Sequence, residues 1–288
     1  MMETGKPPMN GKELVSVIIP TRNSEKTLPI CLASIRNQTY RNIEIIVVDN
    51  FSSDRTVEIA KDYGAKVYIK GYERSSQKNY GAMKAHGKCL YFVDADFYLH
   101  PKLIEEAINK MKEGYDALIV LNISDPRPSL WAKVRHYERL SYYGSGIYEA
   151  ARFMRKEIFL KAGGFDTKLY ANEDYDLHER LLKVGARIGR TRYFEIHLGE
   201  PKSLREVVVK NYYYGKSLAK YFTKNPKVSH LSPVRRTFLR REIIKLLSLN
   251  SFYIIYLIIF LKFVQSVAAF LGLLFRKSLT PYVSYSRE

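Results

Sequence analysis

The chain has 288 residues, of which 46% are hydrophobic and 13% aromatic, and it carries a formal net charge of +18. This length and apolar content suffice to bury one core with an appended segment, and they exclude an intrinsically disordered protein. The two cysteines, Cys31 and Cys89, lie inside apolar segments and are too few for a disulfide framework, so we expect reduced core residues of a cytoplasmic domain. No apolar run precedes Leu14, so residues 1–12 predict no secretory signal.

The positive charge requires an anionic partner, which could be nucleic acid, an anionic membrane or a phosphorylated substrate. The densest basic cluster directly precedes the most apolar segment of the chain. It consists of Arg235, Arg236, Arg240, Arg241 and Lys245. This placement favours a membrane. The sequence contains no recognised nucleic-acid-binding motif, so we predict no nucleic-acid partner.

Residues 14–199 alternate apolar runs with helix-like stretches, a pattern typical of βα units around a largely parallel sheet. The predicted strands are Val15–Ile19, Ile43–Val48, Lys66–Ile69, Cys89–Val93, Ala117–Leu121 and Tyr193–Ile196. The predicted helices are Thr27–Asn37, Asp54–Tyr63, Gln77–Ala85, Lys102–Lys112 and Asp174–Val184. The first, second and fourth strands are almost continuous apolar runs, which indicates a sheet covered on both faces.

The composition changes after Pro201. Residues 203–224 are predicted to form a tyrosine-rich helix, and a basic amphipathic segment extends to Ser248. The following segment, Phe252–Phe275, is almost entirely apolar and is long enough to span a bilayer. Its interior polar residues are Lys262, Gln265 and Ser266. A charge at the centre of a span costs about 2.5–3.5 kcal/mol, so a span, an interfacial or re-entrant helix and a buried soluble helix all remain open.

The sequence Asp94-Ala95-Asp96 directly follows the fourth predicted strand. In extended backbone, residues two apart face the same way, so both carboxylates would point into the crevice at the carboxyl end of the sheet. Oxygen donors there suit Mg²⁺ or Mn²⁺ bridging to substrate phosphates. The alternative is a solvated acidic turn.

Polar residues also follow the first two strands. Pro20-Thr21-Arg22-Asn23 ends the first strand, and Asp49-Asn50 ends the second, where their side chains could hydrogen-bond a base or a ribose. For Asp49 a helix or turn cap is the alternative. Neither loop contains the glycine pattern of dinucleotide enzymes or of phosphate-binding loops, which disfavours hydride transfer and ATP hydrolysis.

Two further polar features lie later in the chain. Glu173-Asp174 opens a predicted helix after the turn Gly163-Gly164-Phe165-Asp166, and acidic residues are also favoured at this position by the helix dipole alone. His197 follows the predicted strand Tyr193–Ile196; a lone histidine is more often structural, although neutral imidazole is a competent metal ligand.

Taken in order, these motifs resemble those of the family 2 inverting glycosyltransferases with the GT-A fold, over residues 14–200. The resemblance implies an α/β fold, a Rossmann-like mixed sheet flanked by helices, with a helical C-terminal membrane-associated extension. One departure concerns the base-binding loop: many members carry two acidic residues followed by glycine where this chain has Asp49, Asn50 and Phe51.

The resemblance also implies roles for individual residues. The expected donor-binding residues are Pro20, Thr21, Arg22, Asn23, Asp49, Asn50, Arg74, Lys78, Asp94, Ala95 and Asp96. Asp96, with Asp94 and His197, would hold Mn²⁺ or Mg²⁺. Asp174 would be the base that deprotonates the acceptor, and Glu173 would position the acceptor. For Arg74 and Lys78, an ordinary exposed cation is the alternative.

The resulting hypothesis is transfer of a single sugar from a UDP-, GDP- or dTDP-sugar to a polyprenyl-phosphate or lipid-linked acceptor. Single transfers are expected because the chain lacks the Gln-x-x-Arg-Trp motif of processive synthases. Residues 124–148 are the expected acceptor loop. A non-catalytic, membrane-bound sugar-nucleotide-binding protein is the alternative.

The hypothesis divides the chain into five parts and places it at the cell membrane, with the catalytic domain in the cytoplasm. The expected parts are a flexible N-terminus (1–13), the catalytic domain (14–202), a basic and aromatic membrane-proximal region (203–248), a hydrophobic membrane segment (249–276) and a tail (277–288).

Overall fold

The computed structural model describes residues 13–71, 73–142, 149–169, 172–224 and 252–275, which belong to two compact units. The first unit comprises Met1–Ser124, Gly146–Lys168 and Glu173–Gly199, and the second comprises Asp125–Ser145, Leu169–Asn172 and Glu200–Glu288. The second unit therefore includes residues 125–145, 169–172 and 200–202 of the range 14–202 that the sequence predicts as the catalytic domain. Most of residues 1–13, the basic segment from 225 to 248 and the tail lie outside the described residues.

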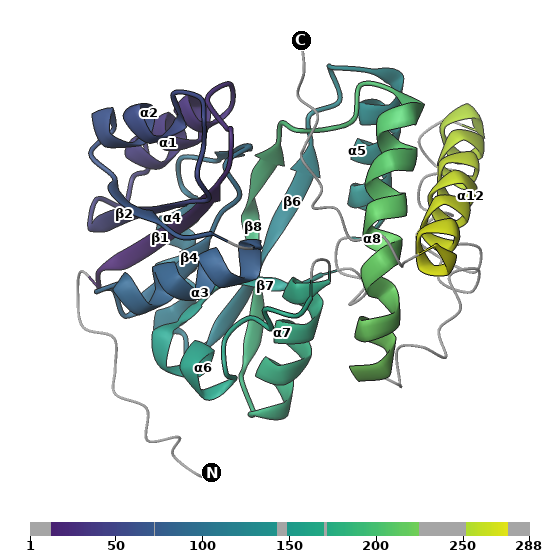
Figure 1. The fold of residues 1–288 in the computed structure, drawn as a ribbon. Helices are drawn as coiled ribbons and strands as arrows, with labels where there is room; N and C mark the ends of the chain where they lie inside the picture. Colours follow the sequence, from purple (N-terminus) through teal and green to yellow (C-terminus); the bar gives the residue numbers. More distant parts are fainter. Residues whose placement is uncertain (1–12, 72, 143–148, 170–171, 225–251, 276–288) are drawn as a thin grey trace. The chain divides into compact units, whose positions relative to one another are not determined.

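In its described residues, the first unit is built on an eight-stranded mixed sheet with the order β3-β2-β1-β4-β7-β6-β8-β5 (Figure 1). The strands are β1 Val15–Thr21, β2 Ile43–Asp49, β3 Lys66–Ile69, β4 Cys89–Phe92, β5 Phe97–Leu99, β6 Ala117–Ser124, β7 Ala151–Arg155 and β8 Ile188–His197. Strands β3, β2, β1 and β4 are parallel. Strand β7 is antiparallel to β4 and β6, and β5 is antiparallel to β8.

Helices cover both faces of this sheet because successive residues of the central strands point in opposite directions. The helices are α1 Leu28–Arg36, α2 Thr56–Asp62, α3 Arg74–Lys84, α4 Leu103–Lys112, α6 Lys156–Lys161 and α7 Glu173–Lys183. On β1, Val17 and Ile19 join a core cluster with residues of α1 and α4. The intervening Ile18 joins a second cluster with residues of α3 and α7.

The predicted strands are all present, although Tyr193–Ile196 proves to be the end of the longer β8. Strands β5 and β7 and the short helix α6 were not predicted, nor was the helix Leu130–Tyr142 of the second unit. Strand β5 has only three residues, and β7 reads Ala-Arg-Phe-Met-Arg, in which two arginines interrupt the apolar pattern. The strands β5 and β7 were not predicted because neither has the length or the apolar periodicity that marks a strand.

The second unit contains three described helices, α5 Leu130–Tyr142, α8 Leu204–Lys224 and α12 Phe252–Leu274 (Figure 1). Among the described residues, α12 is the one helix long and apolar enough to cross a membrane by length and composition. Helices α8 and α12 pack with their backbones in contact, since a Cβ added at Gly215 would overlap the carbonyl of Ala269.

Candidate active site

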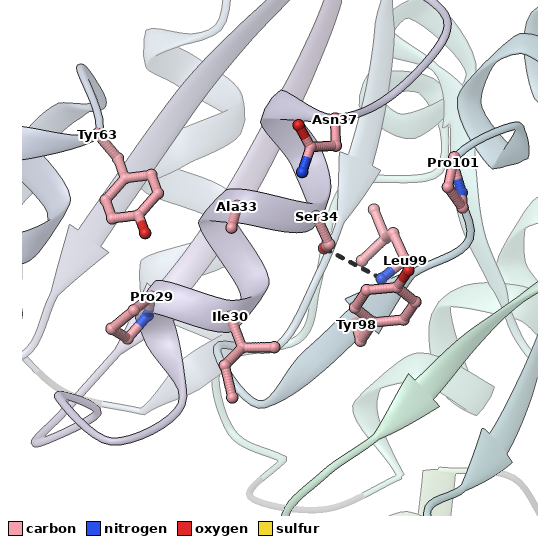
Figure 2. Close-up of a pocket in the computed structure, with 9 residues that line it drawn as sticks. All are labelled: Pro29, Ile30, Ala33, Ser34, Asn37, Tyr63, Tyr98, Leu99 and Pro101. Carbon is pink, nitrogen blue, oxygen red and sulfur yellow. Dashed lines mark hydrogen bonds between the residues drawn. The ribbon is translucent and has the colours of Figure 1, made fainter.

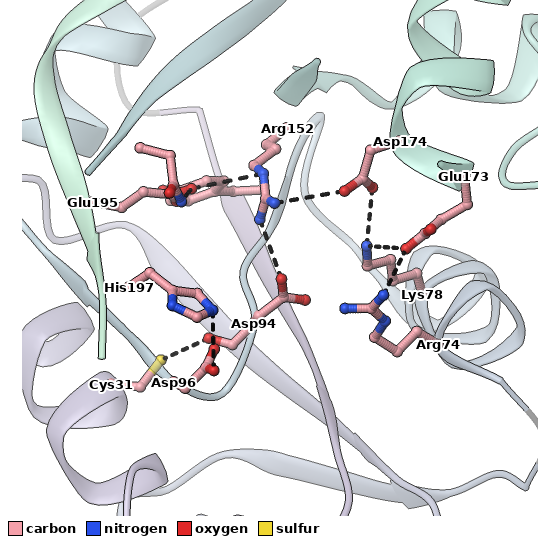
Figure 3. A network of polar contacts seen from close by, with 12 residues as sticks. Cys31, Arg74, Lys78, Asp94, Asp96, Arg152, Glu173, Asp174, Glu195 and His197 are labelled. Atoms are coloured by element: carbon pink, nitrogen blue, oxygen red, sulfur yellow. Dashed lines mark hydrogen bonds and ion pairs between the residues drawn. The ribbon is translucent and has the colours of Figure 1, made fainter. Parts of the chain in front are cut away.

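The Asp94-Ala95-Asp96 motif follows β4, as predicted, and it directly precedes β5. Its backbone is not extended, however, because the Phe97 N–H closes a turn on the Asp94 carbonyl at 3.2 Å. The two carboxylates therefore have different partners, contrary to the simple expectation that residues two apart share one direction. Asp94 lies 3.4 Å from Arg152, and Asp96 lies 3.4 Å from His197 (Figure 3).

His197 reaches Asp96 because of the strand register. Strands β5 and β8 pair with Phe97 opposite His197, so the imidazole lies beside the Asp-x-Asp turn and contacts the Phe97 ring edge-on at 5.2 Å. The following backbone closes over the turn, since Leu198 N–H donates to the Asp96 carbonyl at 2.8 Å. A Cβ at Gly199 would overlap the Asp96 carboxylate, so a larger residue at this position would displace the Asp96 side chain.

The second acidic pair, Glu173 and Asp174, occupies the first turn of α7, as predicted. Both carboxylates contact Lys78 of α3: the Lys78 ammonium lies 3.0 Å from Asp174 and 3.5 Å from Glu173. Arg74, one turn earlier, lies 3.5 Å from Glu173. Only 1% of the Lys78 side chain is exposed, so this lysine is a buried counter-ion of the acidic pair and not an ordinary surface cation.

Arg152 of β7, which the sequence analysis did not single out, connects the two acidic clusters. Its guanidinium lies 3.4 Å from Asp94, 3.5 Å from Asp174 and 3.6 Å from Glu195 (Figure 3). It also lies over the Phe97 ring, 5.0 Å from the centroid. The acid motif after β4 and the acid pair of α7, which are 80 residues apart in the chain, therefore face one shared cation.

The third partner of Arg152 is a buried acid, Glu195. Glu195 of β8 is fully buried and accepts hydrogen bonds from the Tyr91 hydroxyl at 2.7 Å and from the Asn122 amide at 2.8 Å. These neutral donors leave the Glu195 carboxylate oriented toward the guanidinium. Tyr91, Asn122 and Glu195 thus form a second layer that fixes the position of Arg152 in the site.

Mutual pairing keeps the central groups charged. Burial alone would raise the pKa of Asp94, but Lys78 and Arg152 lower it below its ordinary value. The pKa of Asp174 is lowered against burial by the same two cations. Conversely, burial would lower the pKa of Lys78, but Asp174, Asp94 and Glu173 raise it. The site is therefore an alternating set of anions and cations.

The ends of β1 and β2 form a second polar region, because Thr21 and Asp49 are register partners. Asp49 is fully buried; one of its oxygens accepts from the Thr21 hydroxyl at 2.8 Å, and the other accepts from the Ser52 N–H at 2.8 Å. Asp49 therefore orders the loop that follows β2, which agrees with the alternative role of Asp49 as a turn cap. Phe51, two residues later, is 72% exposed and has a left-handed backbone with φ +50°.

The other predicted donor-binding residues frame this loop. Pro20 is buried in β1, whereas Arg22 is exposed and Asn23 has φ +48°. The Asn23 N–H donates to the Ser52 hydroxyl at 2.8 Å, which joins the β1 loop to the β2 loop. Gln77 of α3 links the ends of β1 and β2, since its side-chain amide donates hydrogen bonds to the carbonyls of Thr21 and Val48.

A shallow pocket of about 350 Å³ lies between α1 and β5 (Figure 2). Its lining is Pro29, Ile30, Ala33, Ser34, Asn37, Tyr63, Tyr98, Leu99 and Pro101. This lining contains no acidic or basic residue, so the pocket has none of the ionic chemistry of the Arg152 site.

Similar proteins were found by sequence. An uncharacterized glycosyltransferase of Rickettsia typhi, RT0329, is 30% identical over 190 residues, which cover 60% of each chain. The 4,4'-diaponeurosporenoate glycosyltransferase of Staphylococcus haemolyticus is 44% identical over 102 residues, 33% of this chain and 27% of that one. The chain thus spans about 60% or less of the length of these two relatives.

A similar fold occurs in the mannosyltransferase PcManGT of Pyrobaculum calidifontis, whose structure contains GDP-Man and Mn²⁺. The TM-score is 0.66 at 16% identity, over 95% of this chain and 90% of that chain. This similarity confirms the predicted GT-A fold, a mixed sheet with flanking helices. The family model of Glycosyl transferase family 2 matches residues 16–170, more than half of the chain. The chain therefore belongs to glycosyl transferase family 2.

Proposed function

We propose that the protein transfers one sugar from a nucleotide-diphospho-sugar to an acceptor by a single displacement with inversion at the anomeric carbon. The observation that carries the proposal is the position of Arg152, whose guanidinium pairs with Asp94 of the β4 loop and with Asp174 of α7. A sugar diphosphate between these elements would have the donor-side acids and the acceptor-side acid within one site.

The acid–base step is assigned to Asp174. Its pairing with Lys78 and Arg152 keeps this carboxylate deprotonated, so it is ready to accept the proton of an acceptor hydroxyl. As the acceptor oxygen bonds to the anomeric carbon, the bond to the diphosphate breaks, its electron pair leaves with the nucleoside diphosphate, and the hydroxyl proton passes to Asp174. Glu173, buried beside it, positions the acceptor side of the site. A phosphate acceptor, already ionised, would not require this proton transfer.

A divalent cation fits the donor side. Within the described residues, no cluster of three His, Cys, Asp or Glu side chains is arranged to hold a metal. The buried Asp94 Oδ1 nevertheless has no hydrogen-bond partner, and Asp96 and His197 add a carboxylate and an imidazole nearby. This donor set suits Mn²⁺ or Mg²⁺. When bound, the ion would neutralise charge on the leaving diphosphate.

The proposed acceptor is a polyprenyl phosphate or a lipid-linked saccharide at the cell membrane, with the catalytic unit in the cytoplasm. Three observations support it: the apolar helix α12, the net charge of +18, and the basic cluster that precedes α12 in the sequence. The described part of the proposed acceptor loop is the region from Ser124 to Tyr142, which includes α5.

A thermal-shift panel of UDP, GDP, dTDP and ADP, each with and without Mn²⁺, tests donor binding. We expect one diphosphate to raise the unfolding temperature, and Mn²⁺ to increase that rise. The Asp96→Ala variant should lose the additional rise in unfolding temperature that Mn²⁺ causes. Absence of any nucleotide response in the wild type would contradict the proposal. Nucleotide binding without donor hydrolysis or transfer would instead support the non-catalytic alternative.

A further inference from the structure

Helix α12 has two different apolar faces. One face is buried in the second unit and consists of Ile254, Leu257, Ile258, Leu261 and Ala268. The other is exposed and consists of Phe252, Tyr253, Tyr256, Phe260, Phe263, Val267, Phe270, Leu271 and Leu274. We call the latter the outer face. It is rich in aromatic side chains, and it contains no charged residue.

The buried face is fixed along its length to two polar helices. In the first half of α12, Ile254 to Leu261 share a hydrophobic cluster with Val134 of α5 and Val207 of α8. In the second half the backbones touch, because a Cβ at Gly272 would overlap the carbonyl of Tyr212 on α8. Both halves of α12 therefore lie against other helices of the second unit.

Lys262, the charge that makes a membrane span costly, is directed toward the protein. Its ammonium forms an ion pair with Glu138 of α5, whose side chain is 1% exposed. Glu138 is also paired with Arg135 at 2.5 Å, and Arg135 lies 3.7 Å from Glu200. The lysine is thus part of a charge network on α5, on the side away from the outer face.

These contacts are incompatible with α12 crossing a bilayer as packed here. Helix α8 would have to enter the hydrocarbon with it, and the sequence of α8 contains six charged residues. They are Arg205, Glu206, Lys210, Lys216, Lys220 and Lys224. Intramembrane charges are rare and are normally paired or functional, so a helix of this composition does not enter lipid. Lipid can therefore reach α12 only on its outer face.

The outer face is large enough to require a partner. Taking roughly 200 Å² for a fully exposed aromatic side chain, the aromatic residues of the outer face, about 60% exposed on average, present on the order of 700 Å² by themselves. Monomeric soluble proteins rarely expose contiguous apolar patches beyond a few hundred Å². The basic cluster at residues 235–245 and the net charge of +18 favour an anionic partner over an uncharged one.

We propose that α12 lies along an anionic membrane, not across it, with the outer face in the lipid interface and Lys262 held by Glu138 on the protein side. This inference deepens the membrane association proposed above. It specifies the face that meets the lipid, and it makes the protein monotopic.

Vesicle binding tests the face. The variant Tyr256→Ser/Phe263→Ser/Phe270→Ser removes exposed rings, and the control Met83→Ser/Leu160→Ser/Leu182→Ser makes three comparable changes at exposed apolar residues of the first unit. Wild type and control should cosediment with phosphatidylcholine–phosphatidylglycerol vesicles, and the outer-face variant should bind at least tenfold more weakly. Equal binding by both variants would overturn the proposal. The proposal would also be overturned if the wild type is a dimer and the outer-face variant is a monomer that binds lipid normally, since the outer face would then contact a second copy of the chain.

Thiol accessibility tests the orientation. The native Cys31 and Cys89 are fully buried, so cysteines introduced by Ser251→Cys or Ser278→Cys, at polar positions before and after α12 in the sequence, can be labelled selectively. In sealed inside-out vesicles from an expressing host, a membrane-impermeant maleimide should label both positions without lysis. Labelling of one position only after lysis would establish a span and overturn the proposal. Neither measurement requires sugar transfer, so a failure here is distinguishable from a failure of the proposed enzymatic function.

Discussion

Arg152 holds the Asp94 carboxylate from 3.4 Å, although the two residues are separated by 58 positions in the chain. The same guanidinium reaches Asp174, so a single side chain of β7 sets the distance between the donor-side and acceptor-side acids. Because Glu195 lies behind it, Arg152 cannot turn toward one acid without leaving a buried carboxylate unpaired.

Replacing Arg152 by lysine should keep the charge but lose the three-way geometry, since an ammonium is a point charge and a guanidinium is a planar fork. We expect a folded protein whose kcat for sugar transfer falls about 100-fold, as small misplacements of reacting groups can cause. Steady-state kinetics and circular dichroism measure the two properties. The matched control is Arg155→Lys on the same strand, which pairs with Asp116 and should retain activity. Equal activity of Arg152→Lys and the control would contradict this role.

Gly199→Ala tests the position of Asp96 without altering the carboxylate itself. The added methyl group would overlap the Asp96 side chain, and the backbone at Gly199 is not left-handed, so no conformational strain is added. We expect the Mn²⁺ or Mg²⁺ concentration needed for half-maximal activity to rise about 10- to 100-fold, as for other changes that displace a ligand's support. The unfolding temperature should change little. If the metal concentration for half-maximal activity is unchanged, Asp96 is not a metal ligand.

The parts of the site that sequence predicted are those that local position reveals. Asp94, Asp96 and Glu173-Asp174 stand directly after a strand or at a helix start, and the apolar pattern locates both positions. The sequence also placed the sheet, because buried strands are continuous apolar runs. Arg152, Tyr91 and Glu195 were not predicted. Their roles depend on contacts such as Tyr91–Glu195, which joins residues 104 positions apart.

Local conformation was also beyond the sequence patterns. Apolar alternation cannot reveal that the Asp-x-Asp segment turns, because the turn depends on one Phe97-to-Asp94 hydrogen bond. In the same way, the hydropathy of residues 252–275 indicated a lipid-compatible helix. The partner of Lys262 became visible only once α5 was placed against α12.

Phe51→Gly should raise stability while weakening donor binding. A left-handed backbone costs a non-glycine residue about 1–2 kcal/mol, partly offset by the greater unfolded-state entropy of glycine, so a net gain of about 0.5–1 kcal/mol is expected. Base–aromatic stacking contributes about 1–3 kcal/mol, so loss of this exposed ring should raise the donor KM about 5- to 100-fold. Phe51→Tyr keeps the ring and should keep the KM. If the Phe51→Gly variant is more stable but has an unchanged donor KM, Phe51 does not contribute to donor binding.

The acid stability of the first unit should depend on Glu44. Burial would raise its pKa, but donors at Ser16, Lys66 and His86 lower it from 4.5 to about 2. A folded-state pKa below the unfolded value gives stability that is present above about pH 4.5 and is lost as the pH falls toward 2.

The Glu44→Gln variant should therefore unfold more easily at neutral pH, by about 1–3 kcal/mol, since hydrogen bonds to a charged acceptor are lost. Between pH 4.5 and 2 its stability should fall less steeply than that of the wild type. Denaturant titrations across this range measure both effects. Glu58→Gln, which removes only an exposed pair with Arg55, should behave as the wild type does. Parallel pH profiles for the wild type and Glu44→Gln would exclude Glu44 as the cause.

The most direct test of the account separates donor hydrolysis from sugar transfer in Asp96→Ala and Asp174→Asn, with Mn²⁺ and the nucleotide-sugar identified by thermal shift. If the acids divide one reaction between them, Asp96→Ala should lose both activities, whereas Asp174→Asn should lose transfer to a hydroxyl acceptor and retain slow hydrolysis of the donor. Full transfer by either variant would contradict the claim that the acids on either side of Arg152 serve a single glycosyltransferase site.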